Sequence, residues 1–473
     1  MTFSKIIINN LFFTILLLIS GGILLYFGYY NEFCEGGPDN FWHYYFSKYA
    51  FQFPNFFLHH WGKPIFILLT TGFAQFGFYG IVVFNVICGL LSTIVSYKIL
   101  QHLNINYKWL IVPLLLFSPL YFLVLQSSLT EPLFSLLLIT GSYLYLKQKY
   151  ILGSLVLSFL LFSRSEGLFI LVCFATFLLI IRQWKSLPLL GFGFIIYAIV
   201  GKLMGHDFFW YFTENPYALE SPYGHGHFMD MLYQYKDIWG LPFLITLCIS
   251  TVVLFYYFFK QKQYLFWKPI NETSYVFYLI FVPAFVFLLF HLTVWHFGMC
   301  GSAGLRRVLA CVFPCFAVLS MWGINKLVFD RWSKILSSVL IIVFLVYHLQ
   351  SPFSTFGFPL KSYGPDREVQ NAARYAKTIM PENCIVYYAQ PGIIFDLDRN
   401  PFDKVHNAEL FGFKDICNNK NELPSFVFWD SQFSEFSCGV TPADVENCGY
   451  TLLKELYDSS EFHLKVYKKE PTK

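Results

Sequence analysis

The sequence predicts a mostly α-helical protein: a polytopic transmembrane helix bundle of about 11 spans, followed by a small extracytoplasmic α/β domain. Of its 473 residues, 56% are hydrophobic and only 13% are charged, whereas soluble domains carry roughly 25% charged residues. Apolar runs of about 18 residues or more recur along the chain, and such runs are long enough to cross a bilayer. This composition excludes a soluble globular enzyme, a disordered protein and a nucleic-acid-binding module.

The apolar runs set the expected order of the spans. The first run, Ile6 to Tyr30, follows Lys5. At about 25 residues it is too long for the core of a cleaved signal peptide, so we expect it to remain as the first span. The other runs centre near residues 77–97, 109–126, 131–146, 150–163, 167–181, 187–203, 240–259, 274–295, 304–325 and 335–350.

Charged residues predict the orientation of these spans. With the N-terminus inside, the inner segments hold thirteen bases and two acids, whereas the outer segments hold seven bases and ten acids. Basic residues concentrate on the cytoplasmic side of membrane proteins. An odd number of spans then places the tail outside, together with the long loops 31–76 and 204–239. The inner bases are Lys5, Lys98, Lys108, Lys147, Lys149, Arg182, Lys185, Lys260, Lys262, Lys268, Lys326, Arg331 and Lys334, and the inner acids are Glu272 and Asp330.

The chain is expected to divide into a transmembrane domain, residues 1–350, and an extracytoplasmic α/β domain, residues 351–473. Residues 361–473 carry a net charge of −4, from 13 bases and 17 acids. A helical pattern at 367–380 and a strand-like run at 384–389 precede two further strand-like runs, at 425–429 and 463–467. Two disulfides are compatible with the outer location of the tail, with three pairings open, among Cys384, Cys417, Cys438 and Cys448.

The first outer loop carries the candidate catalytic acids. Glu35 precedes a tight Gly36-Gly37-Pro38 turn, and Asp39 follows it. Asp39 is positioned to cap a helix that starts at Phe41. It is equally suited to act as a general base at the membrane surface, where partial desolvation raises the pKa of a carboxyl group.

Cationic groups that suit a phosphate follow in the same loop and near the tenth span. His59, His60 and Lys63 lie within five residues of one another. They fit either a phosphate contact at headgroup depth or an interfacial aromatic and basic belt. Arg306 and Arg307 follow a segment of small residues on the expected outer side. These two arginines break the charge asymmetry, which favours a phosphate clamp.

Three further charged residues lie at the ends of apolar runs. Glu131 opens the fourth span, with Ser128 or Thr130 as its cap, and a carboxylate is favourable at a helix N-terminus in any case. Arg164 and Glu166 lie two residues apart between two apolar runs. Charges at membrane depth are costly, so residues kept there usually pair or perform a function. We interpret Glu131, Arg164 and Glu166 as supporting residues of the site.

These motifs, in this order, resemble the GT-C superfamily of integral membrane glycosyltransferases, most closely its bacterial polyprenyl-phosphate-sugar-dependent and mannosyltransferase-like branches. The resemblance covers residues 1–330. It rests on Gly37-Pro38-Asp39, His60-Trp61-Gly62-Lys63-Pro64, Thr130-Glu131-Pro132-Leu133-Phe134, Ser163-Arg164-Ser165-Glu166-Gly167 and Gly304-Leu305-Arg306-Arg307. The superfamily implies a catalytic Asp in the first outer loop, which matches Asp39. It often has an adjacent acidic pair there, whereas this chain has Asp39-Asn40 with Glu35 upstream, so both acids remain candidates.

The resemblance implies an inverting glycosyltransferase of the cell envelope, integral to the membrane. It would move a sugar from a polyprenyl-phosphate donor to an extracytoplasmic glycan, lipid or protein. Asp39 or Glu35 would act as the base, and Arg306, Arg307, Lys63 and His60 would bind the donor phosphate. The alternatives are an oligosaccharide ligase or polymerase that uses a lipid pyrophosphate, and a non-catalytic lipid or solute transporter. No cofactor and no metal ligands are identified, and the requirement for a divalent cation, the sugar and the acceptor stay open.

The charge asymmetry makes a testable prediction about topology. Because Lys147 lies on the basic side and Lys473 ends the tail, Lys473→Cys in intact cells should react with an impermeant thiol reagent and Lys147→Cys should not. Both variants are made in a cysteine-depleted background. The reverse labelling pattern would overturn the orientation.

Overall fold

A computed structural model describes residues 3–217, 219–264, 270–328, 334–362, 364–410, 416–417, 423–457 and 462–471. Lys268, Asp330, Arg331 and Lys473, and the side chains of Lys5 and Lys334, lie outside this description. The chain divides into two compact units. The first comprises Met1–Gly36 and Phe46–Pro359, and the second comprises Gly37–Tyr45 and Leu360–Lys473.

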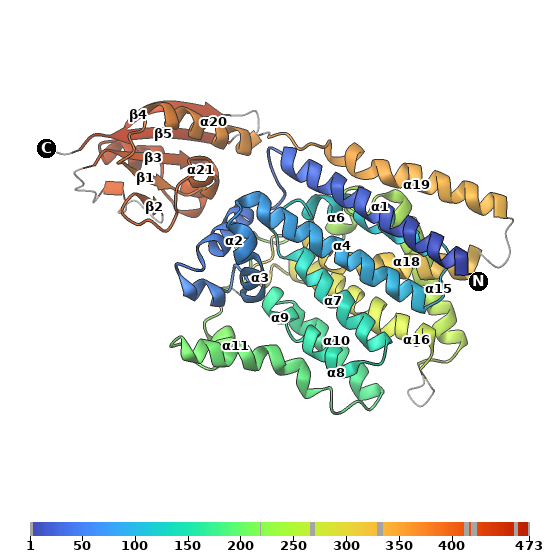
Figure 1. The fold of residues 1–473 in the computed structure, drawn as a ribbon. Helices are drawn as coiled ribbons and strands as arrows, with labels where there is room; N and C mark the ends of the chain where they lie inside the picture. The colour runs from blue at the N-terminus through green and yellow to red at the C-terminus, as the bar shows by residue number, and fades with distance from the viewer. Residues whose placement is uncertain are drawn as a thin grey trace. The chain divides into compact units, whose positions relative to one another are not determined.

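The first unit is a bundle of apolar helices (Figure 1). Within the described part of this unit, five segments are long and apolar enough to cross a membrane: Asn10–Tyr30, Phe78–His102, Leu241–Lys260, Glu272–His296 and Arg306–Leu327. Of the other predicted spans, the last lies within the 23-residue helix Lys334–Phe356 and the rest contain shorter or broken helices, so the count of about 11 crossings stays a prediction. The helices are α1 (Phe3–Tyr30), α3 (Pro64–Ala74), α4 (Phe78–His102), α5 (Ile111–Leu116), α6 (Pro119–Val124), α7 (Glu131–Leu146), α8 (Tyr150–Leu157), α9 (Leu160–Ser163), α10 (Gly167–Ile180), α11 (Phe192–Leu203), α15 (Leu241–Lys260), α16 (Glu272–Val276), α17 (Val282–His296), α18 (Phe313–Val328) and α19 (Lys334–Phe356).

Prolines explain several of these boundaries. The predicted run at 109–126 contains two short helices, α5 and α6, and Pro119 opens the second of them. Proline lacks an N–H group and is tolerated in a helix mainly at its first turn. The same preference makes α2 (Pro38–Tyr49) begin at Pro38. Asp39 therefore lies inside the first turn of α2, and the expected helix start at Phe41 is wrong.

The two long loops contain short helical segments. The 31–76 loop holds α2, the 3-10 helix η1 (Pro54–Leu58) and α3. The 204–239 loop holds α12 (Trp210–Thr213), α13 (Asp230–Tyr233) and α14 (Tyr235–Ile238). Trp295 at the end of α17 donates an Nε1–H bond of 2.8 Å to Asp230, so the 204–239 loop is tied to the bundle.

The second unit is a small α/β domain, as the tail pattern predicted. Its sheet has the order β2-β1-β3-β5-β4, in which β1, β2 and β3 are parallel and β5 pairs antiparallel with β3 and β4. The strands are β1 (Ile385–Tyr388), β2 (Asn407–Glu409), β3 (Ser425–Asp430), β4 (Thr451–Tyr457) and β5 (His463–Lys469), accompanied by α20 (Gly364–Ile379), α21 (Pro391–Asp396) and α23 (Pro442–Asn447). The predicted helix at 367–380 and the three strand-like runs correspond to α20, β1, β3 and β5.

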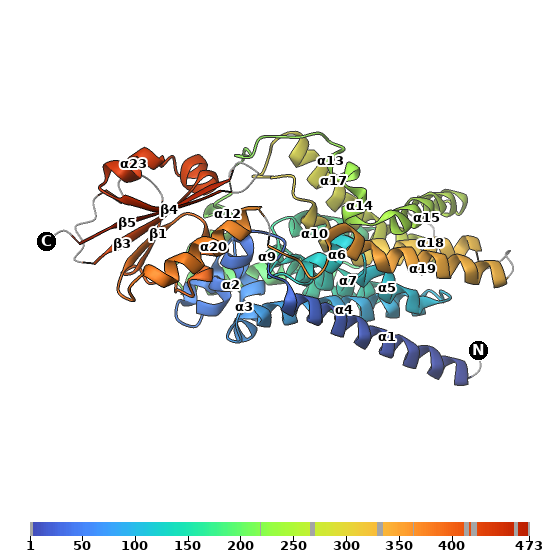
Figure 2. The same cartoon turned by 90° about the horizontal axis from the view of Figure 1, so that it is seen from above.

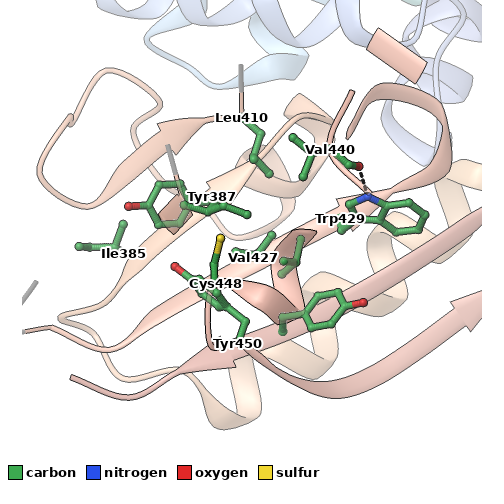
Figure 3. Close-up of a cluster of buried hydrophobic side chains, with 11 residues drawn as sticks. Ile385, Tyr387, Leu410, Val427, Trp429, Val440, Cys448 and Tyr450 are labelled. Carbon is green, nitrogen blue, oxygen red and sulfur yellow. Dashed lines mark hydrogen bonds between the residues drawn. The ribbon is translucent and has the colours of Figure 1, made fainter. Parts of the chain in front are cut away.

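An aromatic and aliphatic core holds this domain together (Figure 3). Trp429 on β3 is buried and donates its indole N–H to the Val440 carbonyl oxygen at 2.6 Å, which satisfies a polar group that the core would otherwise desolvate. One disulfide joins Cys417 to Cys448. The other two tail cysteines contact other groups: Arg399 donates to the Cys384 sulfur at 3.0 Å, and the Cys438 thiol donates to the Leu410 carbonyl.

Candidate functional site

Charged residues from four parts of the first unit meet in its apolar interior. Arg164, between α9 and α10, donates to Glu131 at 2.8 Å and to Glu166 at 2.9 Å. His291 on α17 lies with its Nε2 3.4 Å from the same Glu166 oxygen. Arg307 lies with its Nε 3.9 Å from Glu131. We call Glu131, Arg164, Glu166, His291 and Arg307 the Arg164 cluster.

Burial makes this cluster energetically demanding. Glu131 is 1% exposed and Arg307 is 8% exposed at the side chain. An ionised group in an apolar interior loses its hydration, and it remains charged only when opposite charges and hydrogen bonds compensate. Arg164 supplies that compensation to two carboxylates at once. One acceptor stays unused, because Glu131 Oε2 is buried and has no hydrogen-bond partner among the described residues.

Local sequence explains why Glu131 and Arg164 hold these positions. The Asn85 amide on α4 donates to the carbonyl oxygens of Ser127 and Leu129, at 2.7 and 2.9 Å, and so fixes the segment before Glu131. Thr130 makes no capping bond; its hydroxyl lies 3.5 Å from Arg164. Gly167 begins α10 where an added Cβ would lie 2.5 Å from the Leu160 backbone, so only glycine permits this tight turn after Arg164.

Lys63 lies beside the Arg164–Glu166 turn. Its ammonium group donates to the Ser165 hydroxyl at 3.2 Å and to the Tyr217 hydroxyl at 2.9 Å, and it lies 4.7 Å from the centre of the Tyr217 ring. Lys63 has a φ of 64° at the N-terminus of α3. A non-glycine residue adopts this conformation at a cost of about 1–3 kcal/mol, and such residues gather at functional sites.

His60 is adjacent to Lys63 in space but differs from it in charge. Its ring packs against Trp210 and Tyr211, with centroids 4.9 and 5.0 Å away. Burial, followed by the nearby Lys63 charge, lowers the pKa of His60 to about 4. Its imidazole is therefore neutral at pH 7 and contributes no positive charge to an anion site.

The two adjacent arginines separate at the start of η5 (Arg306–Val312). Arg307 is buried and faces Glu131, whereas Arg306 donates to Asp237 at 2.5 Å and lies 5.4 Å from the Phe356 ring. Gly304, with a φ of +64°, precedes them where a Cβ would lie 2.6 Å from Trp295. Because Gly304 has no side chain, this turn can pack against α17, and η5 therefore begins beside the Arg164 cluster.

Glu35 and Asp39 lie near the start of the 31–76 loop. Glu35 is in the turn after α1, within the first unit, and Asp39 is in the first turn of α2, within the segment 37–45 that belongs to the second unit. Within that unit, Phe41 and Tyr44 contact Phe395, with ring centroids 4.9 and 5.8 Å away. The start of α2 is therefore held by aromatic packing.

The structure brings together most of the predicted site residues of the first unit. Glu131, Arg164, Glu166 and Arg307 form one cluster, and Lys63 is joined to it through Ser165. Sequence reasoning missed His291 and Tyr217. A histidine within an apolar run is a signal for the first, because ionisable residues inside spans are usually functional. Within the described ranges, no group of three His, Cys, Asp or Glu side chains is arranged to hold a metal ion.

No family model and no curated protein matches the sequence. Solved structures, in contrast, match the structure of this chain. ArnT from Cupriavidus metallidurans, bound to undecaprenyl phosphate, matches with a TM-score of 0.61 at 10% identity over 97% of both chains, and its apo form matches equally. The oligosaccharyltransferase of Archaeoglobus fulgidus, tethered to an acceptor peptide, matches with a TM-score of 0.52 at 11% identity over 95% of this chain and 74% of that chain. The chain shares the fold of these solved structures, in agreement with the resemblance that its motifs show.

The shared role of Arg164 predicts unequal effects on stability. Arg164→Met leaves the buried Glu131 and the partly buried Glu166 without their main partner, and breaking a buried ion pair typically costs about 3–5 kcal/mol. Arg306→Met is the matched control, because Arg306 and Asp237 are 24% and 38% exposed and exposed pairs contribute about 0–1 kcal/mol. The midpoint temperature of thermal denaturation in detergent should fall much further for Arg164→Met than for Arg306→Met. Adding Glu131→Gln and Glu166→Gln to Arg164→Met should recover most of the lost midpoint temperature. Equal falls for the two arginine variants would contradict this account of the cluster.

Proposed function

We propose that the chain is an inverting glycosyltransferase that moves a sugar from a polyprenyl-phosphate donor to an acceptor outside the cytoplasm. The GT-C fold supports glycosyl transfer in general. One of the neighbours binds undecaprenyl phosphate, which supports a lipid phosphate as the carrier. The observation that carries the proposal is the surplus of positive charge buried around Arg164 and Lys63.

The charges of this region favour an anion. Lys63, Arg164 and Arg307 contribute three positive charges, and Glu131 and Glu166 contribute two negative charges, so these five groups sum to +1. Positive groups in a water-poor site stabilise a leaving phosphate more strongly than the same groups in water. Arg307 and Lys63 are the residues that we assign to the donor phosphate, while Arg164 holds the two carboxylates. Arg306 is assigned a smaller contribution to binding of the donor phosphate, because it is already paired with Asp237.

The reaction needs few protein groups. The acceptor hydroxyl oxygen attacks the anomeric carbon, and the bond from that carbon to the phosphate oxygen breaks with inversion. The hydroxyl proton passes to a carboxylate, and the electron pair of the broken bond leaves on the lipid phosphate. Asp39 is the base that we propose, with Glu35 as the alternative, because both stand on the loop where the superfamily resemblance implies an acid.

The proposed side of the membrane follows from the charge asymmetry of the sequence. Loops 31–76 and 204–239, which carry Lys63 and Tyr217, are expected outside, as is the C-terminal α/β unit. A ligase that uses a lipid pyrophosphate remains the second candidate, because one of the two neighbours is an oligosaccharyltransferase. Purified protein incubated with a panel of polyprenyl-phosphate and polyprenyl-pyrophosphate sugars distinguishes the two. Release of the lipid monophosphate supports the proposal, and exclusive release of the lipid pyrophosphate contradicts it.

The assignment of the base predicts the effect of neutralising Asp39. Asp39→Asn should lower the rate of transfer about 10²–10⁴-fold, the usual contribution of a general base, while donor binding is retained. Glu35→Gln is the matched control and should lower the rate of transfer far less. If Glu35→Gln abolishes turnover while Asp39→Asn does not, the base is Glu35.

The assignment of the donor phosphate predicts a difference between the two neighbouring arginines. Removing a charged hydrogen bond costs about 1.5–3 kcal/mol, so Arg307→Ala should raise the donor KM about ten- to a hundredfold. Arg307→Lys should restore part of the loss, because lysine lacks the bidentate geometry of arginine. Arg306→Ala should raise the donor KM much less, since Asp237 engages that side chain. Saturation curves for Arg307→Ala that superimpose on wild type would remove Arg307 from the site.

A further inference from the structure

A long apolar groove lies on another part of the first unit, between α5, α15, α18 and α19, which lie side by side in Figure 2. Its volume is about 730 Å³. Ile245 and Ile249 of α15 line it together with Phe344 and Tyr347 of α19, and residues of α5 and α18 complete the lining. None of the residues of the Arg164 cluster lines this groove.

The length of the groove matches a lipid chain. On α19 its lining residues extend from Thr355 to Ile341, which at 1.5 Å per residue is about 21 Å. Half of a bilayer hydrocarbon core is about 15 Å thick, so the groove is long enough for an acyl chain of one leaflet.

One end of the groove is polar and positively charged. Lys236, the only charged residue among those that line it, lies at this end near Gly240, where α15 begins. Ser351, Ser354 and Thr355 of the α19 end supply hydroxyl groups there. A Cβ on Gly240 would lie 2.5 Å from the Ser351 hydroxyl oxygen, so the two helix ends are close.

The charge of Lys236 is not offset by its acidic neighbour. Asp237 is held by Arg306 at 2.5 Å, and no ion-pair partner of Lys236 is present among the described residues. Lys236, Asp237 and Arg306 therefore sum to +1. An apolar chain site that ends at a positive group, with hydroxyl donors beside it, is complementary to an amphiphile with an anionic headgroup.

We propose that this groove binds an anionic phospholipid, with one acyl chain between α15 and α19 and the phosphate at Lys236. This lipid is a second ligand, separate from the proposed donor. The two adjacent arginines support the separation, because Arg306 pairs with Asp237, the neighbour of Lys236 in sequence, whereas Arg307 faces Glu131 in the Arg164 cluster. The proposal does not depend on glycosyl transfer.

Native mass spectrometry of the purified full-length chain tests the headgroup contact. The probes are phosphatidylglycerol and the zwitterionic phosphatidylethanolamine, titrated separately into delipidated protein. Lys236→Gln should weaken retention of phosphatidylglycerol about fivefold, since one lysine contributes about 1 kcal/mol to anionic lipid binding, and should leave phosphatidylethanolamine unchanged. Lys202→Gln on α11 is the matched control and should bind like wild type. Equal losses for the two lysine variants would overturn the proposal.

Filling the groove tests the chain contact. Ile245→Trp places an indole in the groove and should reduce retention of both phospholipids, whereas Ile199→Trp on α11 should not. Ile245 and Ile199 are 49% and 50% exposed, so the two substitutions are matched in burial. Equal retention by both tryptophan variants would overturn the proposal. So would loss of undecaprenyl phosphate, rather than phosphatidylglycerol, from Lys236→Gln, because the groove would then belong to the donor.

Discussion

The Arg164 ion network is the constraint on which the architecture of the first unit depends. In an apolar bundle, each buried charge costs several kcal/mol unless an opposite charge and hydrogen bonds compensate it. Arg164 meets this condition for two carboxylates, Glu131 and Glu166, at 2.8 and 2.9 Å. The start of α7 and the turn before α10 must therefore stay in register. Asn85 on α4 and the close turn at Gly167 secure that register from either side.

The same network leaves positive charge in place for an anion before any ligand binds. Once the two carboxylates are neutralised by Arg164 and Arg307, the neighbouring Lys63 leaves the region with a surplus positive charge. Nothing needs to move to create that charge, and a preorganised charge in a dry site stabilises a leaving phosphate effectively. Such a cluster contributes little net stability compared with apolar packing. Such a cluster is consistent with the donor-phosphate role that we propose for Arg307 and Lys63.

Much of the fold follows from local pattern, because the bilayer and the α/β layers impose simple periodicities. Each apolar run coincides with one helix or with a broken helical segment, and the tail pattern at 367–380 and 384–389 corresponds to α20 and β1. Two strands, β2 and β4, went unpredicted. β2 has only three residues, and β4 is largely exposed, so neither carries a strong hydrophobic signal. Strand order and the Cys417–Cys448 pairing depend on contacts distant in sequence, which no local pattern encodes.

The candidate site residues could be identified from the sequence, because charged residues at the ends of apolar runs are energetically costly and usually pair or perform a function. Only the tertiary structure decided which of them meet. In the structure Arg164 pairs with Glu131, 33 positions away in sequence. His291 of α17 lies beside Glu166. The adjacent Arg306 and Arg307 contact different acids. The physical reason is that pairing in an apolar interior is decided by where helices and turns pack, and proximity in sequence does not specify that packing.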